Sequence, residues 1–404
     1  MPGPLHGYRI LDLSAVISGP YGTMILADQG ADVIKVEPPG RGDFTRAAGN
    51  KSGGLSASFL NNNRNKRSIA IDLRHPDGIA VVKRLARTCD VLVQNFRPGV
   101  ADRLGVGEAA IRAVAPNIIY VSISGFGETG PFAHKPVYDP IVQALSGLAS
   151  VQGGSDSARP RLVRTILPDK LTAITGAQAI TAALLARERT GVGQHVRLSM
   201  LDAIVAFLWS SDMGGQTYVS REVSAQRAAS FIDLIYETRD GHMSVAVMTN
   251  EQWAALTRAL NRPEWLEDPR FATPELRDLN IDVRLELIQS VLVERTTAEW
   301  MHILEAEGVP CAPVLTRREM IEHPQIAATG IVVETDHPQA GRLRQARNAA
   351  CFSATPPEHR RGAPALGEHT DEILREAGFT DDEITRLRDT ALGGASSRSA
   401  AAAE

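Results

Sequence analysis

Residues 8–37 read YRILDLSAVISGPYGTMILADQGADVIKVE and carry the clearest fold signal of the chain. Residues 8–13 and 31–37 are rich in Ile, Leu and Val, which is typical of β-strands. A Ser-Gly-Pro break separates the first of these segments from residues 21–29, which can form a helix that ends at a glycine. Two strands joined by one helix form a parallel pair with a right-handed crossover. The stretch therefore predicts an α/β fold with a Rossmann-like parallel sheet.

The same alternation of strand and helix continues along the first half of the chain. Further strands are expected at residues 68–73, 90–95 and 117–124, with helices at residues 76–88 and 108–114 between them. After residue 216, short strand patterns are followed by amphipathic helices, which indicates a smaller α+β domain. The predicted domains are a large Rossmann-like domain over residues 1–216, a small α+β domain over residues 217–325, a return to the large domain over residues 326–390, and a disordered Ala/Ser-rich tail over residues 391–404.

Within the small domain, two strands are expected at residues 230–236 and 242–248, joined by an Asp-Gly turn. Amphipathic helices are expected at residues 251–260, 283–294 and 297–307. The proline-bracketed residues 309–314 are expected to lead out of this domain.

The composition limits the class of protein. The chain of 404 residues is longer than one ordinary core requires, and its net charge of −4 at pH 7 opposes a general role in binding nucleic acid. Cys89, Cys311 and Cys351 stand far apart without a C-x-x-C pattern, so we interpret them as reduced thiols rather than as a disulfide or a metal site. No export signal is present, and no apolar run reaches the ~18 residues of a membrane span. We therefore expect a cytoplasmic protein with no metal site and no nucleic-acid or membrane partner.

Residues 166–177 read ILPDKLTAITGA and begin a helix that continues to about residue 190. The side chains are apolar or small on almost every face, so we expect the helix to be buried within its own domain. Asp169 lies in its first turn, directly after a proline. This carboxylate can stabilise the start of the helix by about 1 kcal/mol, or it can be a nucleophile or base at the mouth of a buried helix. The helix alone leaves both interpretations open.

Basic side chains follow the expected strands at the sheet edge where parallel sheets bind ligands. Arg74 follows the third expected strand, and Arg97 and Arg103 follow the fourth. They can hold phosphate groups, or they can form a solvated basic surface. Asn95 and Phe96 precede Arg97 and add an amide and an aromatic face, which favours a nucleotide-like anion. The first strand is not followed by G-x-G-x-x-G, so a nicotinamide or flavin enzyme is not favoured.

Nine short sequence blocks follow one another in an order that characterises one family. They are LHG at 5–7, ILDL at 10–13, GADVIKVEPPG at 30–40, NKRSI at 65–69, NFRPG at 95–99, SGFG at 124–127, TGVGQ at 190–194, GVPCAPV at 308–314 and LGEHT at 366–370. With these blocks the chain resembles the class III CoA-transferases over nearly its whole length, to about residue 387. That family includes formyl-CoA:oxalate, carnitine and dicarboxylate CoA-transferases, and α-methylacyl-CoA racemase is a relative.

The resemblance implies which residues form the active site and that the protein assembles as a homodimer. Asp169 corresponds to the nucleophilic aspartate of the family. The residues that correspond to CoA contacts are Ile17, Ser18, Ile71, Asp72, Leu73, Arg74, Asn95, Phe96, Arg97, Arg103, Lys135, Val137 and Tyr138. The family forms interlocked homodimers, in which two protomers thread through each other like rings and both ends of the chain build the larger domain. Acyl-CoA and a carboxylic acid are the implied substrates, and no permanently bound cofactor is implied.

The implied reaction has a physical rationale. The Asp169 carboxylate attacks a thioester carbonyl to give a mixed anhydride, and an aspartyl-CoA thioester then forms on the enzyme. The start of a buried helix keeps a carboxylate ionised yet poorly hydrated. One alternative is a racemase-type epimerase, although the racemases carry a His-Asp pair where this chain has Tyr138 and Asp139. Another alternative is a non-catalytic acyl-CoA-binding protein.

The sequence indicates the identity of the acid substrate less clearly than it indicates the type of reaction. The formyl-CoA branch carries a long glycine-rich loop where this chain has only residues 213–215, Met-Gly-Gly, which opposes oxalate or formate as a substrate. We expect a small dicarboxylate, with succinyl-CoA as donor, because Arg46 and Arg164 are available for a second carboxylate. Either arginine can equally be a surface charge.

Overall fold

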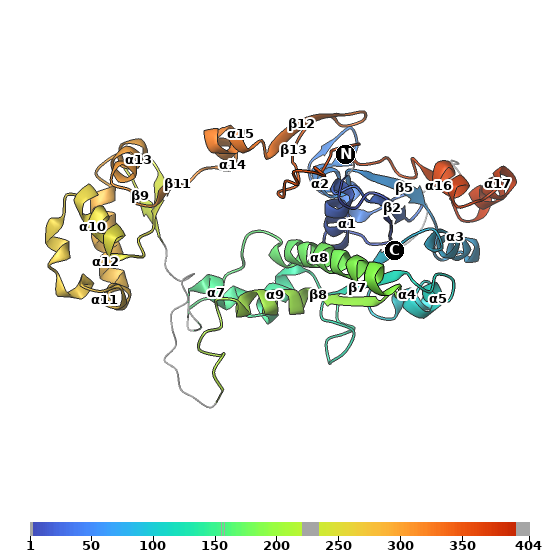
Figure 1. Cartoon of the computed structure of the whole chain (residues 1–404), viewed down its shortest axis with the longest axis horizontal. Helices are drawn as coiled ribbons and strands as arrows, with labels where there is room; N and C mark the ends of the chain where they lie inside the picture. Colours follow the sequence, from blue (N-terminus) through green and yellow to red (C-terminus); the bar gives the residue numbers. More distant parts are fainter. Residues whose placement is uncertain (1–2, 155, 157, 220–233, 393–404) are drawn as a thin grey trace, which may run out of the picture. The chain divides into compact units, whose positions relative to one another are not determined.

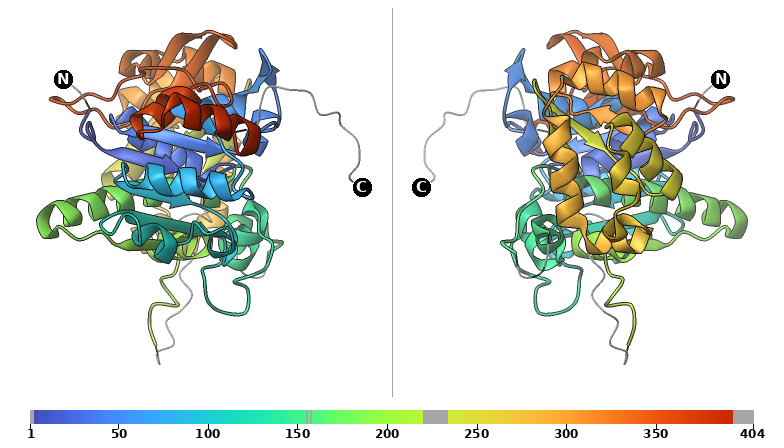
Figure 2. Two further views of the ribbon diagram at one scale, coloured as in Figure 1. Left: turned by 90° about the vertical axis from the view of Figure 1, so that its right-hand side faces the viewer. Right: turned by 90° about the vertical axis from the view of Figure 1, so that its left-hand side faces the viewer.

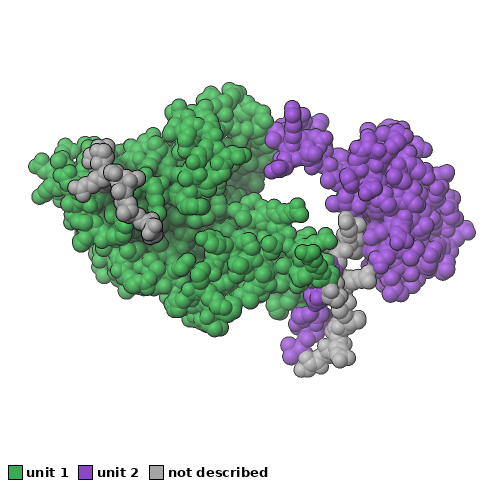
Figure 3. Space-filling model, turned by 180° about the vertical axis from the view of Figure 1, so that it is seen from behind, with its two compact units in different colours: residues 1–153, 157–213, 331–404 green, residues 154–156, 214–330 purple. Residues whose placement is uncertain are grey.

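The chain folds into two compact units, which Figure 3 distinguishes by colour. The computed structural model describes residues 3–154, 156, 158–219 and 234–392. The large unit comprises residues 1–153, 157–213 and 331–404, and the small unit comprises residues 154–156 and 214–330. The large unit thus combines segments from both halves of the sequence.

A parallel sheet forms the centre of the large unit (Figure 1). Its strand order is β5 (Lys66–Ala70), β2 (Asp32–Glu37), β1 (Arg9–Asp12), β6 (Val91–Gln94), β7 (Ile119–Ser124) and β8 (His195–Ser199). All neighbouring strands are parallel. The chain passes to one side of β1 and then to the other, so the topological switch point lies between β1 and β6, where such sheets bind ligands. The predicted α/β fold with a parallel central sheet is confirmed.

Helices cover both faces of this sheet. On one face Leu26 of α1 (Ser18–Asp28) and Ile180 of α8 (Leu167–Thr190) lie in one core cluster. On the other face Val82 of α3 (Pro76–Ala86) packs in a cluster with Leu374 of α16 (Thr370–Glu376). Helices α5 (Glu108–Arg112) and α17 (Asp381–Thr390) contribute to the second cluster. Figure 2 shows these C-terminal helices, in red, against the blue N-terminal strands.

The remaining elements of the large unit surround the sheet. They are β3 (Lys51–Ser52), β4 (Leu55–Ser56), η1 (Phe44–Arg46), α2 (Ala57–Asn63), α4 (Val100–Arg103), α6 (Asp139–Leu145), α7 (Leu148–Gly153), α9 (Met200–Trp209) and the antiparallel pair β12 (Val332–His337) and β13 (Gly341–Ala346). Ala391 and Leu392, at which the predicted tail begins, are buried. The rest of that tail, residues 393–404, lies outside the described residues.

Helix α8 differs from the expectation that it is buried on all sides. Thr172, Gly176 and Ile180 are buried, whereas Ile174 is 51% exposed and Leu185 is 52% exposed. Within the described residues, α8 is covered toward α1, the sheet, α6 and α9, whereas the face that carries Ile174 and Leu185 is open. The sequence pattern indicates that a helix face is apolar, but it does not indicate what covers that face.

The small unit has its own sheet and core. Its antiparallel sheet runs β11 (Cys311–Pro313), β10 (His242–Val245) and β9 (Ile235–Glu237), so the segment expected to lead out of the small domain pairs with β10 instead. The other elements are α10 (Asn250–Ala259), η3 (Pro263–Leu266), η4 (Pro269–Phe271), α11 (Pro274–Leu279), α12 (Ile281–Leu292), α13 (Thr297–Ala306), α14 (Arg317–Glu322) and α15 (Pro324–Thr329). Trp253 and Trp265 stack in its core with ring centroids 6.2 Å apart. Residues 230–233 of the predicted first strand lie outside the described residues.

None of the helices in the described ranges is both long enough and apolar enough to cross a membrane.

Candidate active site

Asp169 lies in the first turn of α8, where the helix start offers unsatisfied N–H groups. The N-cap residue is Ile166, whose side chain has no acceptor. The carboxylate of Asp169 is partly buried, and the backbone N–H and the hydroxyl of Ser18 lie close enough to it to lower its pKa. Burial, followed by the negative charge of Asp139, raises the pKa of Asp169 to about 6, although the two Ser18 groups act in the opposite direction. Asp169 is therefore largely ionised at neutral pH but poorly hydrated, as a nucleophilic carboxylate must be.

Asp139 is the second acidic group of this site and the first residue of α6. Its Oδ2 lies 3.5 Å from the Asp169 backbone nitrogen, and its Oδ1 accepts a 2.6 Å hydrogen bond from Nε2 of Gln143. Gln143 also accepts a hydrogen bond from the Val163 N–H at 2.9 Å, which ties α6 to the loop before α8. Burial raises the pKa of Asp139 as well. Gln143 thus fixes both the second carboxylate and the approach to the Asp169 helix.

Ser18 brings a second helix start to the same place. It is the first residue of α1, which follows an N-cap, Ile17, without a side-chain acceptor. Since the N-terminal ends of α1 and α8 both carry partial positive charge, the meeting of the two helices stabilises an anion between them. Ser18 was predicted to be a CoA contact, and the structure places it against Asp169.

A cavity of about 930 Å³ opens at the carboxyl ends of β1, β2, β5 and β6. The predicted residues that line it are Ile71, Asp72, Leu73, Arg74 and Phe96. Its walls combine apolar and aromatic surface with arginine side chains, and its volume is suited to a nucleotide-sized group. Ser14 and Ala15 of the loop before α1 also line it, so the loop that leads to Ser18 borders the cavity.

Sequence reasoning missed several residues of this cavity. They include Pro38, Arg41, Asp43, Phe44 and Leu104. The first four follow β2, at the same sheet edge as Arg74. The rule that ligands bind at the carboxyl ends of parallel strands was therefore the signal that could have found them.

Other predicted CoA contacts lie elsewhere in the large unit. Arg97 is exposed and lines a second cavity of about 360 Å³ together with His195 and Ser122. Arg103 is exposed at the end of α4, and Lys135 lies over the ring of Phe132, 3.3 Å from its centroid.

The remaining predicted CoA contacts are Val137, Tyr138, Ile17 and Asn95. Val137 packs against Gly125, where a Cβ would lie 2.1 Å from the valine Cγ1. Tyr138 is 77% exposed, and Ile17 is buried. Asn95 bonds to the backbone of Ala15 rather than facing the large cavity.

The structure corrects the expectation for Arg46. Its Nε and Nη2 bind the Glu37 carboxylate, both at 2.7 Å, and its Nη1 binds the Pro364 carbonyl at 3.0 Å. The buried guanidinium also stacks on Phe59 at 3.8 Å. All three of its nitrogens are occupied within the fold, so Arg46 has a structural role.

Two other predicted arginines keep an exposed side chain. Arg74 is paired with Asp72 through hydrogen bonds of 2.9 and 3.0 Å at the surface. Arg164 is exposed in the loop that Gln143 holds, close in sequence to Asp169. In the described part of the chain, no group of three His, Cys, Asp or Glu side chains could hold a metal ion.

The fold and site define a doubly wound α/β protein with a poorly hydrated carboxylate at a helix start and a nucleotide-sized cavity at the carboxyl edge of its sheet. The chain matches the family model of CoA-transferase family III over residues 5–370. The chain therefore belongs to CoA-transferase family III and is an enzyme that transfers CoA, which confirms the resemblance inferred from the sequence blocks.

Individual relatives and solved structures agree with this assignment. The chain is 36% identical over 380 residues to the succinyl-CoA:glutarate CoA-transferase of Mus musculus, covering 92% of this chain and 86% of that protein. It is 34% identical over 380 residues to the acetyl-CoA:oxalate CoA-transferase of Acetobacter aceti, covering 93% and 96%. Rv3272 from Mycobacterium tuberculosis has a similar structure, with a TM-score of 0.81 and 29% identity over 92% of this chain and 99% of that chain. A CAIB/BAIF family protein from Brucella suis has a TM-score of 0.80 and 29% identity over 93% of this chain and 100% of that chain.

Proposed function

We propose that this enzyme moves CoA from an acyl-CoA to a carboxylic acid and that Asp169 is its nucleophile. The observation that carries the proposal is the partly buried Asp169 carboxylate in the first turn of α8, where α8 packs closely on the helix that begins at Ser18. This arrangement keeps the carboxylate reactive at neutral pH and supplies N–H groups close to the atoms that would change charge.

The proposed reaction consists of two matched halves. A carboxylate oxygen of Asp169 attacks the thioester carbonyl, the carbon–sulfur bond breaks, and CoA leaves as a thiolate from a mixed anhydride. The thiolate then attacks the Asp169 carbonyl, which gives an aspartyl-CoA thioester and releases the donor acid as its carboxylate. The acceptor carboxylate repeats these steps in reverse, so that acceptor acyl-CoA is released and the Asp169 carboxylate is regenerated. Every proton and electron pair is accounted for without a redox cofactor.

The large cavity is the proposed site for the nucleotide end of CoA. Phe96 offers an aromatic face for the base, and Arg41 and Arg74 offer positive charge for phosphates. Ser14 and Ala15 lead from this cavity toward Ser18 and Asp169, which gives the pantetheine arm a direction to follow.

Succinyl-CoA is the proposed donor and a short dicarboxylate such as glutarate is the proposed acceptor. A Mus musculus relative named succinyl-CoA:glutarate CoA-transferase is 36% identical to this chain, and an Agrobacterium fabrum relative named succinate–glutarate CoA-transferase is 35% identical. A second carboxylate on the substrate needs a cation, and Arg164 is the predicted residue that remains exposed beside the Asp169 helix.

We also propose that the enzyme is a homodimer. Exposed apolar side chains gather on helices α6, α8 and α9 of the large unit: Ile141, Leu145, Ile174, Leu185, Phe207 and Trp209. A monomer rarely leaves so many large apolar side chains uncovered on neighbouring helices. Light scattering should give about twice the 43.5 kDa of one chain, and an active species with the mass of a single chain would exclude the dimer.

The decisive experiment compares Asp169→Asn with Asp202→Asn. Asp202 is the third residue of α9, as Asp169 is the third residue of α8, so both substitutions remove a carboxylate from an equivalent helix position. Asp169→Asn should abolish CoA transfer and leave CoA binding intact, whereas Asp202→Asn should keep the rate. Succinyl-CoA followed by hydroxylamine should add a hydroxamate to the peptide that contains Asp169. Turnover by Asp169→Asn, with the asparagine verified by mass, would overturn the proposal.

The acceptor is identified by a panel of acids with succinyl-CoA as donor, with new thioesters detected by mass. Glutarate and dicarboxylates of similar length should react faster than oxalate or monocarboxylates. Incorporation of deuterium at Cα of a 2-methylacyl-CoA, without any acceptor acid, would instead support an epimerase.

A further inference from the structure

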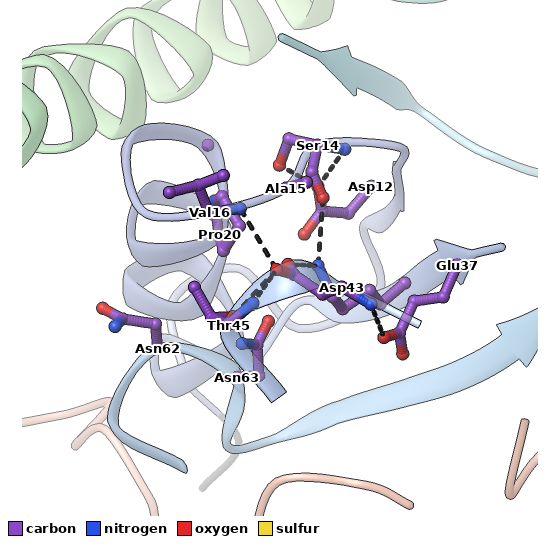
Figure 4. A network of polar contacts seen from close by, with 12 residues as sticks. Asp12, Ser14, Ala15, Val16, Pro20, Glu37, Asp43, Thr45, Asn62 and Asn63 are labelled. Atoms are coloured by element: carbon purple, nitrogen blue, oxygen red, sulfur yellow. Dashed lines mark hydrogen bonds and ion pairs between the residues drawn. The ribbon is translucent and has the colours of Figure 1, made fainter. Parts of the chain in front are cut away.

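The loop Ser14–Val16, which joins β1 to α1, is held by side chains from other parts of the fold (Figure 4). The Ser14 N–H donates to Asp12 Oδ1 at 3.0 Å, and the Ser14 hydroxyl donates to the same oxygen. The Ser14 carbonyl accepts from Nζ of Lys35, on β2, at 3.0 Å. A loop residue is thus fixed on both sides by buried side chains.

The next two loop residues are held in the same way. Asn95, just after β6, accepts from the Ala15 N–H at 2.9 Å and donates to the Ala15 carbonyl at 2.8 Å. The Val16 N–H donates to Oδ1 of Asp43 at 3.3 Å. Val16 has a φ of +71°, a conformation that a β-branched residue adopts only when its surroundings impose it. The side chains around the loop therefore hold it in a shape that it would otherwise leave.

Lys35 and Asp43 form the ionic centre of this arrangement. Lys35 Nζ lies 2.9 Å from Asp43 Oδ2, and the two residues are 0% and 3% exposed. Asp43 is itself fixed by the Thr45 N–H at 2.9 Å and the Thr45 hydroxyl at 2.8 Å. A buried ion pair seldom stabilises a fold more than apolar side chains of the same size would. Stability alone therefore does not explain why two charges are buried beneath this loop.

We infer that Lys35 and Asp43 are positioning residues that hold the Ser14–Val16 loop so that the Ser18 donors face Asp169. Lys35 fixes the beginning of the loop through the Ser14 carbonyl, and Asp43 fixes its end through the Val16 N–H. Ser18 follows two residues later as the first residue of α1. Helix α1 packs on α8 through Gly22 and Ala173, which lie one turn after Ser18 and Asp169. The inference rests on the proposed function, because it assigns the pair to the step in which Asp169 is acylated.

The test replaces the ion pair with uncharged residues in a graded way. Lys35→Met with Asp43→Asn removes both charges but keeps an acceptor for the Val16 N–H, whereas Lys35→Met with Asp43→Leu removes both loop contacts. The matched control is Arg64→Met with Asp28→Asn, because that buried ion pair, at 2.6 Å, has no contact to the loop. All variants are purified as full chains, and folding is checked by thermal unfolding.

The readout is the single-turnover rate of Asp169 acylation at saturating succinyl-CoA, per folded enzyme. The variant with Asp43→Leu should lose about tenfold to a hundredfold of this rate, the variant with Asp43→Asn should lose less, and the Arg64 and Asp28 control should keep it. Because succinyl-CoA is saturating, a lower acylation rate reflects poorer positioning of the reacting groups and not weaker binding of the donor.

Two results overturn the inference. One is a wild-type acylation rate in folded Lys35→Met with Asp43→Leu. The other is an equal loss in the Arg64 and Asp28 control, which would assign the effect to general destabilisation. Failure of the proposed function is recognised separately, since it would appear as turnover by Asp169→Asn.

Discussion

Gly22 of α1 lies directly against the backbone of Ala173 in α8: a Cβ placed on Gly22 would be 2.8 Å from the Ala173 carbonyl oxygen. Gly22 follows Ser18 by one helical turn, and Ala173 follows Asp169 by one turn. The close approach of the two helices thus occurs next to the pair formed by Ser18 and Asp169. The absence of a side chain at Gly22 sets the distance at which Ser18 meets the carboxylate.

Gly22→Ala should therefore impair catalysis more than folding. The methyl group meets backbone, which cannot rotate away, and such overpacking costs about 1–3 kcal/mol. The higher helix propensity of alanine returns about 1 kcal/mol, so the free energy of unfolding should fall only modestly. Because the helices are pushed apart beside the site, kcat should fall by about tenfold or more. Steady-state kinetics and urea unfolding measure the two effects.

Gly176→Ala is the control for this prediction. Gly176 lies in α8 as well, but its nearest neighbours to a new Cβ are side-chain atoms at 3.6 and 3.9 Å. This variant should gain about 0.5–1 kcal/mol of stability and keep its rate. If Gly22→Ala were equally active, the contact between the two helices would not control the site.

The raised pKa of Asp169 predicts how stability depends on pH. The folded chain holds this proton up to a pH of about 6, whereas the unfolded chain releases it near pH 4. Ionisation of Asp169 therefore destabilises the fold progressively between these values, and the penalty is complete above pH 6. Asp169→Asn should be more stable than the parent by as much as about 3 kcal/mol at pH 8 and equally stable below pH 4. Urea unfolding at pH 4, 5, 6, 7 and 8 measures the difference. A stability difference that does not change with pH would contradict the raised pKa.

Asp139→Asn should move the pH dependence of the reaction. The negative charge of Asp139 raises the pKa of Asp169, although burial contributes more, so the pKa should fall only part of the way toward its ordinary value. The acidic limb of kcat/KM, which reports the free enzyme, should shift to lower pH, and activity at pH 5 relative to pH 8 should rise. Asparagine can still accept the hydrogen bond from Gln143, so the loop before α8 should keep its position. An unchanged acidic limb would show that the two carboxylates are electrostatically independent.

The central sheet was predictable from the sequence because its strands alternate with helices and its central strands are rich in Ile, Leu and Val. Residues 8–13 and 31–37 contain β1 and β2, and the segment at 90–95 contains β6. The α8 helix was predicted in position but not in burial, because Ile174 and Leu185 have the same character whether this chain or another covers them. The pairing of β11 with β10 could not be predicted, since it joins segments far apart in the sequence.

The candidate site was only partly predictable for a related reason. Ile71 and Phe96 follow strands, and the sheet brings them into one cavity as expected. Arg46 could have bound a substrate carboxylate, but its guanidinium donates hydrogen bonds to Glu37 and to the Pro364 carbonyl. No local sequence pattern indicates these partners. The approach of Ser18 to Asp169 depends on how two helices pack, which the sequence of either helix does not contain.

Val16→Gly removes the backbone strain of the loop but keeps the hydrogen bonds that hold the loop in place. Val16 is a non-glycine residue with a φ of +71°, a conformation that costs about 1–3 kcal/mol and that glycine adopts freely. The substitution should therefore raise the free energy of unfolding by about 1 kcal/mol or more, as measured in urea. At the same time the loop loses the stiffness of a β-branched residue, so kcat should fall even though the protein is more stable. Val192→Gly, at an exposed position outside the site, is the control and should change neither the rate nor the stability in this direction. A Val16→Gly enzyme that is both more stable and fully active would contradict this prediction. The contacts of Lys35, Asp43 and Asn95 would then suffice to position Ser18, and the strain at Val16 would have no role in catalysis.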